Sequence, residues 1–301
     1  MAAVKIALKI DVDTLVGTQL GVPALVAMCE RLAVPASFYF SLGPDHTGRA
    51  LRRVLRPGFL SKVSRTSVLE HYGLRTLMYG VLLPGPDIGK RCAAIMRGVR
   101  DAGFEVGIHT WDHILWQDFV LRRDAAWTER QLRLAFDRFS EIFGAAPAGH
   151  CAAGWQMNAH AFKLQQALGF QYASDTRGVA PFWPRVEGRA VQCMQLPTTL
   201  PTLDELIGRS DLIGPTPVAH LLQITAKQQR HHVFTLHAEL EGRKLAPWLE
   251  QLILGWRAQG YQLTGLGEYH ASLDAGAVPV HDVVYGEVPG RSGVLALEHV
   301  S

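Results

Sequence analysis

Regular alternation of strand-like and helix-like segments is the feature that most constrains how this chain folds. Short runs rich in β-branched and aromatic residues alternate with segments of helical periodicity, and glycine follows several of these helices. The pattern predicts strands at 4–10, 36–41, 104–109, 171–174, 191–196, 232–237 and 262–266, and helices at 22–32, 88–102, 128–143, 158–168, 217–229 and 247–259. Because repeated βα units build parallel sheets, we expect an α/β fold with one barrel-like domain.

Composition excludes several other classes of protein. The 301 residues are 48% hydrophobic and 19% charged, which is typical of a globular chain with a large core. A net charge of +3 does not indicate a nucleic-acid partner. The four cysteines are far apart and form no CxxC motif, so we expect a reducing compartment. Lys5 and Lys9 interrupt the N-terminal apolar run, which therefore predicts a strand rather than a signal peptide, and no run reaches the ~20 apolar residues of a membrane span.

Two segments do not fit the alternating pattern. Residues 48–86 contain seven arginines and lysines against one acid, Glu70, with apolar residues between them. Such a segment either lies on an anionic membrane surface or packs on the barrel as basic surface helices. The tail at 274–301 is rich in glycine, valine and proline, and it either caps the domain or is partly disordered.

Acidic and histidine side chains gather where predicted strands end. Asp11 and Asp13 follow the first strand and point to the same side, so their repulsion requires a cation unless they merely form a turn. His109 and His113 follow the strand at 104–109, and their spacing puts both on one face of a helical turn. Strand ends of a parallel α/β fold meet at one edge. One aspartate and two histidines there predict a catalytic metal site with open positions for water and substrate.

Two further candidates follow later strands. His237 ends the strand at 232–237, and Asp175 follows the strand at 171–174. A lone histidine is more often structural than catalytic, but the strand end favours a role in acid–base chemistry. A carboxylate at the position of Asp175 could orient a histidine across the mouth of the barrel and raise its pKa.

Taken in order, these motifs resemble the polysaccharide deacetylase superfamily, whose shared unit is the NodB homology domain. The resemblance covers 4–270 and rests on D-V-D, H-x-x-x-H, a glycine-containing segment after 147, an aspartate near 175 and L-H near 236. Wider segments are similar to the deformylases that act on a formamido-arabinose linked to undecaprenyl phosphate. These segments are A-L-K-I-D-V-D-T, A-S-F-Y-F-S-L-G-P-D, R-V-L-R-P-G-F-L, E-V-G-I-H-T-W-D-H, A-A-G-W, S-D-T-R-G, Q-L-P-T-T-L-P-T-L-D-E and T-L-H-A-E-L-E-G.

The resemblance implies a metal-dependent hydrolase of amides. Asp13, His109 and His113 would hold one divalent metal ion, and Asp11 would be the general base. This ligand set suits zinc best, with cobalt, nickel or manganese as alternatives. Removal of the formyl group would yield the aminoarabinose donor for lipid A modification, which confers polymyxin resistance.

The resemblance also implies the fold and the acid. His237 would protonate the leaving amine and Asp175 would orient it. The fold would be a distorted (β/α) barrel of the polysaccharide deacetylase type with about seven strands. We expect one catalytic domain at 1–273, with the insertion at 48–86 and a C-terminal extension at 274–301.

Two motifs depart from the superfamily. Its third motif usually carries an arginine that pairs with the base, whereas H-C-A-A-G at 150–154 has His150 in that place. Its fourth motif usually carries a tryptophan, whereas D-T-R-G supplies Arg177, whose planar fork suits a phosphate unless it forms a loop salt bridge. Large aromatic residues serve as a sugar wall or as core. The predicted substrate contacts are His150, Trp155, Arg177, Phe182 and Glu239. Glu241 is expected to point away from them.

A lipid-linked substrate favours the membrane interpretation of residues 48–86. Its predicted contacts with the anionic inner-membrane surface are Arg52, Arg53, Arg56, Phe59 and Leu60. With no export signal, we expect a peripheral protein on the cytoplasmic side of that membrane. Two alternatives stay open. One is a deacetylase of an N-acetylated glycan or lipid-linked sugar, and the other is an inactive protein that binds lipid-linked sugar on the same fold.

Overall fold

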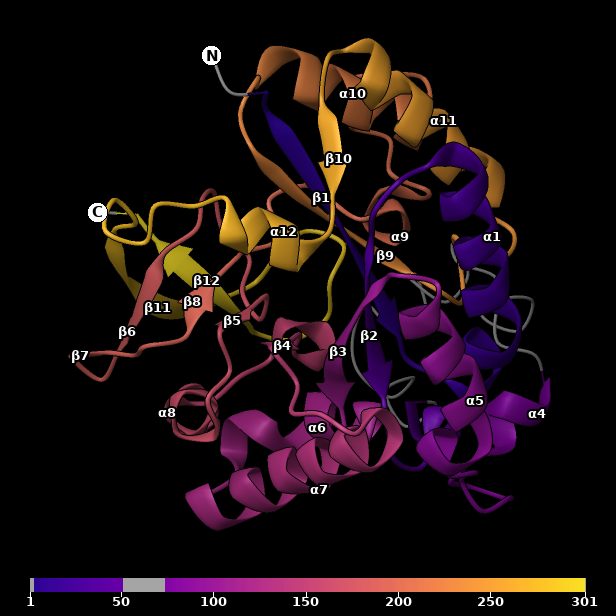
Figure 1. The fold of residues 1–301 in the computed structure, drawn as a ribbon, viewed down its shortest axis with the longest axis vertical. Coiled ribbons are helices and arrows are strands. Elements are labelled where there is room, and N and C mark those ends of the chain that lie inside the picture. Colours follow the sequence, from indigo (N-terminus) through magenta and orange to yellow (C-terminus); the bar gives the residue numbers. More distant parts are fainter. Residues whose placement is uncertain (1–2, 51–73, 301) are drawn as a thin grey trace.

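A curled parallel sheet forms the centre of the molecule, which we describe from a computed structural model covering residues 3–50 and 74–300 (Figure 1). Its strands run in the order β10-β1-β2-β3-β4-β5-β8, and β9 pairs with β1. The bounds are β1 Lys5–Val12, β2 Ser37–Ser41, β3 Glu105–Thr110, β4 Gly149–His150, β5 Tyr172–Ala173, β8 Met194–Gln195, β9 His232–His237 and β10 Gln262–Thr264. This is the expected distorted (β/α) barrel, with eight strands in the described sheet where about seven were expected.

Strand β1 is the central strand of this part of the barrel wall, because it pairs with three neighbours. It pairs with β10 and β2 at successive stretches and with β9 along most of its length. The register places Asp11 level with Tyr39 of β2 and with His237 of β9. Beyond β8, the backbone of Thr199 donates a 3.1 Å hydrogen bond to Val233 of β9 and so joins the two edges. The strand ends that carry the predicted site therefore lie side by side.

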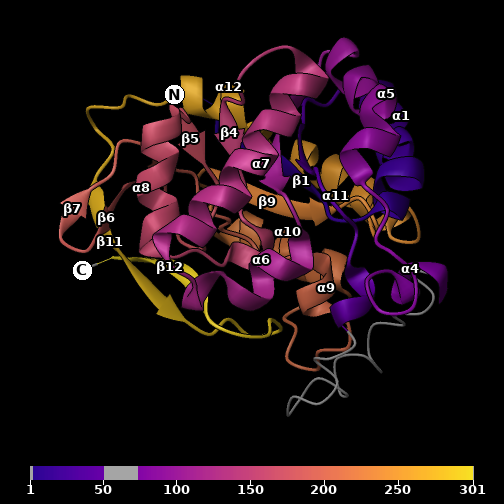
Figure 2. The same cartoon turned by 90° about the horizontal axis from the view of Figure 1, so that it is seen from below.

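Helices surround the sheet, as Figures 1 and 2 show. The long ones agree with the sequence prediction to within a few residues: α1 Val22–Leu32, α5 Ile88–Asp101, α7 Ala125–Phe143, α8 Ala159–Leu168, α10 Pro217–Lys227 and α11 Ala246–Ala258. Shorter ones are η1 Gly17–Gly21, α4 Leu74–Met78, α6 His113–Phe119, η3 Val120–Arg122, η4 Ala153–Trp155, α9 Leu203–Leu206 and α12 Leu266–Ala271. Helix α7 begins three residues earlier than predicted, because the side chain of Asp124 accepts the Trp127 N–H and caps it.

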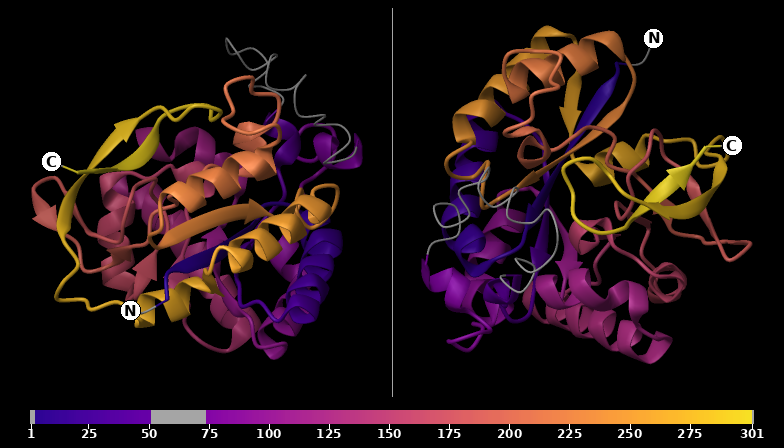
Figure 3. Two further views of the ribbon diagram at one scale, coloured as in Figure 1. Left: turned by 90° about the horizontal axis from the view of Figure 1, so that it is seen from above. Right: turned by 180° about the vertical axis from the view of Figure 1, so that it is seen from behind.

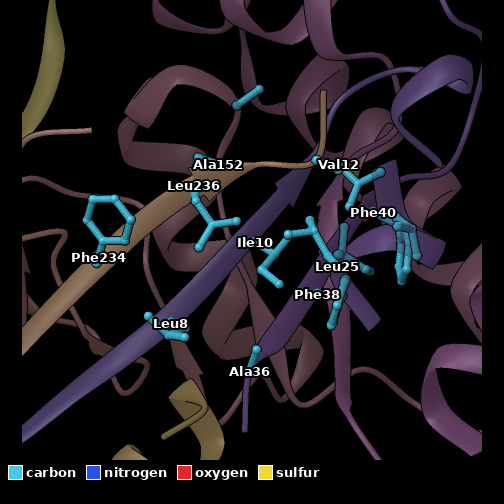
Figure 4. Close-up of a cluster of buried hydrophobic side chains, with 14 of the residues drawn as sticks. Leu8, Ile10, Val12, Leu25, Ala36, Phe38, Phe40, Ala152, Phe234 and Leu236 are labelled. Carbon is cyan, nitrogen blue, oxygen red and sulfur yellow. The ribbon is translucent and has the colours of Figure 1, made fainter. Parts of the chain in front are cut away.

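Alternation along the strands separates the core from the site. Even-numbered residues of β1 pack with side chains of β2, β9 and helix α1, and all are 1% exposed or less (Figure 4). The labelled members of this cluster include Leu8, Ile10, Val12, Leu25, Phe38, Phe40, Phe234 and Leu236. Lys9 and Asp11 therefore belong to the opposite face of β1, inside the barrel, where the site is built.

The C-terminal extension folds into a second sheet. Strands β11 Val280–Gly286 and β12 Leu295–His299 are antiparallel, and β11 also pairs in parallel with β6 Trp183–Val186, which pairs with β7 Arg189–Ala190. Figure 3 shows this small sheet beside the barrel. The sequence left open whether the tail caps the domain or is partly disordered, and the structure shows it as ordered strands of this sheet. No helix in the described ranges has both the length and the apolar character needed to cross a membrane.

Candidate metal centre and active site

Three predicted ligands meet at the carboxyl ends of β1 and β3. His109 Nε2 lies 3.2 Å from Asp13 Oδ1, and His113 Nε2 lies 3.4 Å from Asp13 Oδ2. One ligand atom from each residue lies within 4.8 Å of the others. Among the described residues this is the one such group of metal-ligating side chains.

The two histidines reach the cluster from different elements, not from one helical turn as the sequence suggested. His109 is the next-to-last residue of strand β3, and His113 is the first residue of α6. Asp112 between them caps α6, because its side chain accepts the Leu115 N–H at 3.0 Å. Its other oxygen lies 2.5 Å from His46 Nδ1. The strand-to-helix turn thus aims both rings at Asp13.

The chemistry of the cluster fits a metal ion. Asp13 Oδ1 and His109 Nε2 are buried without a hydrogen-bond partner, which is costly unless a ligand completes them. Two atoms each roughly 2.1 Å from a tetrahedral ion stand about 3.4 Å apart, which matches the observed spacings. Burial alone would raise the pKa of Asp13, but His113 and His109 hold it well below its usual range. An anionic oxygen beside two imidazoles is the donor set of a divalent cation.

A buried lysine pairs with the predicted base. Lys9 is fully buried, and its Nζ lies 3.3 Å from Asp11 Oδ2 and donates to the Ser174 carbonyl at 3.1 Å. It also lies 5.0 Å from the Trp155 ring centre. The other oxygen, Asp11 Oδ1, is buried and has no hydrogen-bond partner. The third motif at 150–154 has no arginine, and Lys9 is the basic side chain that pairs with Asp11 instead. The sequence contained an indication of this pair, because a lysine two residues before Asp11 lies on the same face of the strand.

His237 faces a carboxylate that the sequence did not indicate. Its Nδ1 lies 3.9 Å from Asp204 Oδ1 and has no hydrogen-bond partner. The chain turns after β9, so the Glu241 side chain comes back and accepts a 2.8 Å hydrogen bond from the backbone N–H of His237 instead of pointing away. Burial raises the pKa of Glu241 to about 7, although His237 opposes this. Two acids therefore pack around the predicted general acid.

Asp175 pairs with His150 and not with His237. Its Oδ1 lies 2.8 Å from His150 Nδ1 and accepts the Ala152 N–H at 2.7 Å, while Gln165 donates to its Oδ2. Both members of the pair are almost fully buried. Burial would raise the pKa of Asp175, but His150 and the hydrogen bonds lower it. The expected contact with His237 is absent because β4 and β5 turn these side chains into the protein interior.

Glu239 holds the backbone on which Asp13 of the Asp–His–His cluster is placed. Its Oε1 accepts the N–H groups of Asp13 and Thr14 and the Thr14 hydroxyl, at 3.1, 2.8 and 2.7 Å. Burial and the Asp13 charge raise its pKa well above the usual value. There is no room for a side chain at Gly17, whose Cβ would stand 1.8 Å from Glu239 Oε1. Glu239 therefore fixes the backbone of Asp13, a predicted metal ligand.

The other predicted substrate contacts are largely covered. Trp155 and Phe182 are 1% and 0% exposed. Arg177 donates to Glu205 at 2.5 Å and to the Leu200 carbonyl at 3.2 Å, and it lies over the Trp155 ring. It forms the salt bridge that the sequence left as its alternative role. The predicted membrane contacts lie outside the described residues: Arg52, Arg53, Arg56, Phe59 and Leu60.

Comparison with solved structures defines the class. The fold resembles that of a protein from Mycobacterium smegmatis assigned as a polysaccharide deacetylase, with a TM-score of 0.64, 18% identity and 95% of each chain covered. It also resembles a probable polysaccharide deacetylase of Pseudomonas aeruginosa PAO1, with a TM-score of 0.60, 13% identity and 89% and 90% covered. The molecule is thus a (β/α) barrel of the polysaccharide deacetylase type with an Asp–His–His cluster at its mouth.

Sequence comparison narrows this class to one family. A protein of Shewanella sediminis (strain HAW-EB3) is 36% identical over 294 residues, covering 97% of this chain and 94% of its own. A protein of Wigglesworthia glossinidia brevipalpis is 29% identical over 283 residues, covering 94% and 98%. Both are named as probable 4-deoxy-4-formamido-L-arabinose-phosphoundecaprenol deformylase ArnD. No family model matches the chain. The chain belongs to this deformylase family, which confirms the resemblance seen in the sequence.

Proposed function

We propose that this enzyme removes formate from 4-deoxy-4-formamido-L-arabinose linked to undecaprenyl phosphate. The product is the 4-amino-4-deoxy-L-arabinose donor for lipid A modification. Family membership supports the substrate. The observation that carries the chemistry is the cluster of Asp13, His109 and His113, flanked by Asp11 and His237 at one level of paired strands.

The cluster holds one divalent cation in this proposal. Asp13, His109 and His113 are its ligands, and their donor atoms suit zinc best, with cobalt, nickel or manganese as alternatives. The ion supplies a lowered pKa for the attacking water and polarisation of the formyl carbonyl.

Asp11 and His237 move the protons. Asp11 Oδ1 is the base that accepts a proton from water, while Lys9 holds the other oxygen. Water adds to the formyl carbon, the C–N bond breaks with its electron pair on nitrogen, and His237 gives that nitrogen a proton. Formate and a primary amine result. Each such acid or base contributes about 10²–10⁴-fold to rate.

Product analysis tests the proposal. Metal-loaded protein is mixed with the lipid-linked formamido sugar, and in parallel with its N-acetyl counterpart. We expect formate from the first and no acetate from the second, and a chelator should abolish formate release. Acetate release without formate would replace the proposal with the deacetylase alternative. Binding of the lipid-linked sugar without either product would favour the inactive binding protein.

We also propose that the enzyme works as a peripheral protein at the cytoplasmic side of the inner membrane. Residues 48–86 carry both kinds of side chain that bind a membrane surface. Basic side chains attract anionic headgroups, each contributing about 1 kcal/mol, and apolar side chains become buried in the interface. In the described part of this segment, Val81 and Leu82 are 50% and 74% exposed. Exposed aliphatic side chains beside basic ones support an interfacial role.

Vesicle sedimentation tests the membrane proposal. Binding to vesicles that contain phosphatidylglycerol should exceed binding to pure phosphatidylcholine, and it should fall with added salt. Leu82→Asp should weaken it, whereas the matched control Leu254→Asp, at a leucine 51% exposed on α11, should not. Equal binding to both vesicle types, or equal loss in both variants, would contradict the proposal.

A further inference from the structure

The connection between β11 and β12 brings Arg291 into the active site. Figure 2 shows it running from the small sheet toward α9. Arg291 Nε donates to Glu205 Oε1 at 2.6 Å, and its Nη2 donates to Thr202 Oγ1 at 2.7 Å and to Asp204 Oδ1 at 3.0 Å. The guanidinium lies 4.6 Å from the Trp155 ring centre. Only 12% of this side chain is exposed, so the arginine is built into the wall of the site.

Two arginines and two acids form this part of the wall. Arg177 donates to Glu205, as Arg291 does, and both guanidinium groups lie over the Trp155 ring. Two guanidinium groups therefore face the two carboxylates of Asp204 and Glu205. Burial would raise the pKa of Glu205, but the two arginines lower it. A neutral network of this kind is suited to fixing carboxylates in place and not to capturing a free anion.

Asp204 is the carboxylate that the network turns toward His237. The same Oδ1 that accepts from Arg291 and Thr202 lies 3.9 Å from His237 Nδ1. That nitrogen is buried and has no hydrogen-bond partner. Catalytic hydrogen bonds are often long before substrate binds and tighten in the reacting complex. A shift of roughly 1 Å would complete this one at the distance of an ordinary hydrogen bond.

We propose that Arg291, through Asp204, is a positioning residue for the general acid His237, so that the C-terminal extension forms part of the active site. This inference rests on the proposed function. Asp204 accepts a hydrogen bond from the Nδ1–H of the imidazolium, which keeps its proton on Nδ1 and turns Nε2 toward the leaving nitrogen. His237 then releases its Nε2 proton as the C–N bond breaks. Arg291 itself contacts neither substrate nor metal.

Two substrates separate positioning of the acid from general damage. Deformylation of the sugar requires protonation of an amine, whereas 4-nitrophenyl formate releases a phenolate that needs no acid. Arg291→Ala and Asp204→Asn should each lower kcat on the sugar about 10²-fold, with little change in KM. Both should keep their rate on the ester within about threefold, measured above spontaneous hydrolysis. Arg291→Lys should retain part of the sugar activity, since lysine keeps the charge without the fork.

The double variant Arg291→Ala/Asp204→Asn tests the route of action. It should be no slower than Asp204→Asn alone, because both changes interrupt one chain of contacts. Arg185→Ala is the matched control, since it removes the exposed Arg185–Asp282 pair between β6 and β11 without touching the wall. It should behave as wild type.

Each outcome decides the inference. Equal losses on both substrates, or unchanged kcat in Asp204→Asn, would overturn it. If Arg291→Ala does not fold, the isosteric Asp204→Asn decides alone. Wild-type protein that cleaves the ester but releases no formate from the sugar would instead overturn the proposed function.

Discussion

The His150–Asp175 pair and the His237–Asp204 pair both lie in this barrel, but only the first has its hydrogen bonds complete. Between His150 and Asp175 the Nδ1–Oδ1 distance is 2.8 Å, both side chains are 1% exposed or less, and further donors satisfy the carboxylate. Between His237 and Asp204 the distance is 3.9 Å, the side chains are 12% and 14% exposed, and Nδ1 has no hydrogen-bond partner.

In our proposal, this difference separates a pair that supports the fold from one that takes part in the reaction. A buried polar group without a partner costs stability, and a substrate or ion that completes it removes that cost. The same reasoning covers Asp13 Oδ1 and His109 Nε2 at the metal cluster. Satisfied pairs should therefore matter for unfolding, and incomplete ones for turnover.

The largest expected effect is on turnover at the incomplete pair. His237→Gln should lower kcat for deformylation by about 10²–10⁴-fold, because the amine would leave without its proton. The free energy of unfolding should stay within about 1 kcal/mol of wild type, since no complete hydrogen bond of Nδ1 is lost. Steady-state kinetics and urea unfolding measure the two quantities. Large destabilisation with little loss of kcat would assign His237 to the fold.

The satisfied pair should show the opposite pattern. Asp175→Asn should lower the free energy of unfolding by about 3 kcal/mol, because an amide cannot accept all the hydrogen bonds that this buried carboxylate accepts from His150, Ala152 and Gln165. The kcat of the folded, metal-loaded variant should remain within about threefold. Asp101→Asn, at an aspartate 62% exposed beside Arg100, is the control and should change stability little. Loss of turnover in stable Asp175→Asn would restore the role predicted from the sequence.

The last prediction concerns the pH dependence of stability through Glu241, an effect that is spread over more than two pH units. Its pKa rises from 4.5 to about 7 on folding, so the native state holds the proton more tightly than the unfolded state between these values. The stabilisation is complete below pH 4.5 and is lost as pH rises toward 7, by about 3 kcal/mol in total. Glu241→Gln should remove this slope, measured by urea unfolding of chelated protein at several pH values. Parallel pH curves for wild type and variant would contradict the assignment.

The strand ends were predictable from the sequence. Asp11, Asp13, His109 and His237 each follow or end a strongly patterned strand, and parallel βα order brings such ends together. The periodicity of the long helices likewise gave their positions within a few residues. These features depend on local pattern, which a single sequence records.

Partner choice was not predictable in the same way. Asp175 could face either histidine, and only the path of the two-residue strands β4 and β5 directs it to His150. Asp204 sits on the four-residue helix α9, and Arg291 comes from a loop 87 positions later in the chain. Neither residue lies in a sequence pattern that would have indicated its contact with the other. Lys9 did have one, because an interior lysine two residues before Asp11 shares its strand face.

The most direct test of the account combines metal content by mass spectrometry with formate release from the lipid-linked formamido sugar. Wild type should hold one divalent ion per chain and release formate. Asp11→Asn should keep the ion and lose formate release, because in our proposal Asp11 moves a proton and is not a metal ligand. His113→Ala should lose both. Metal-free wild type with full turnover, or His113→Ala that retains metal and activity, would contradict the central claim that this cluster is the catalytic centre.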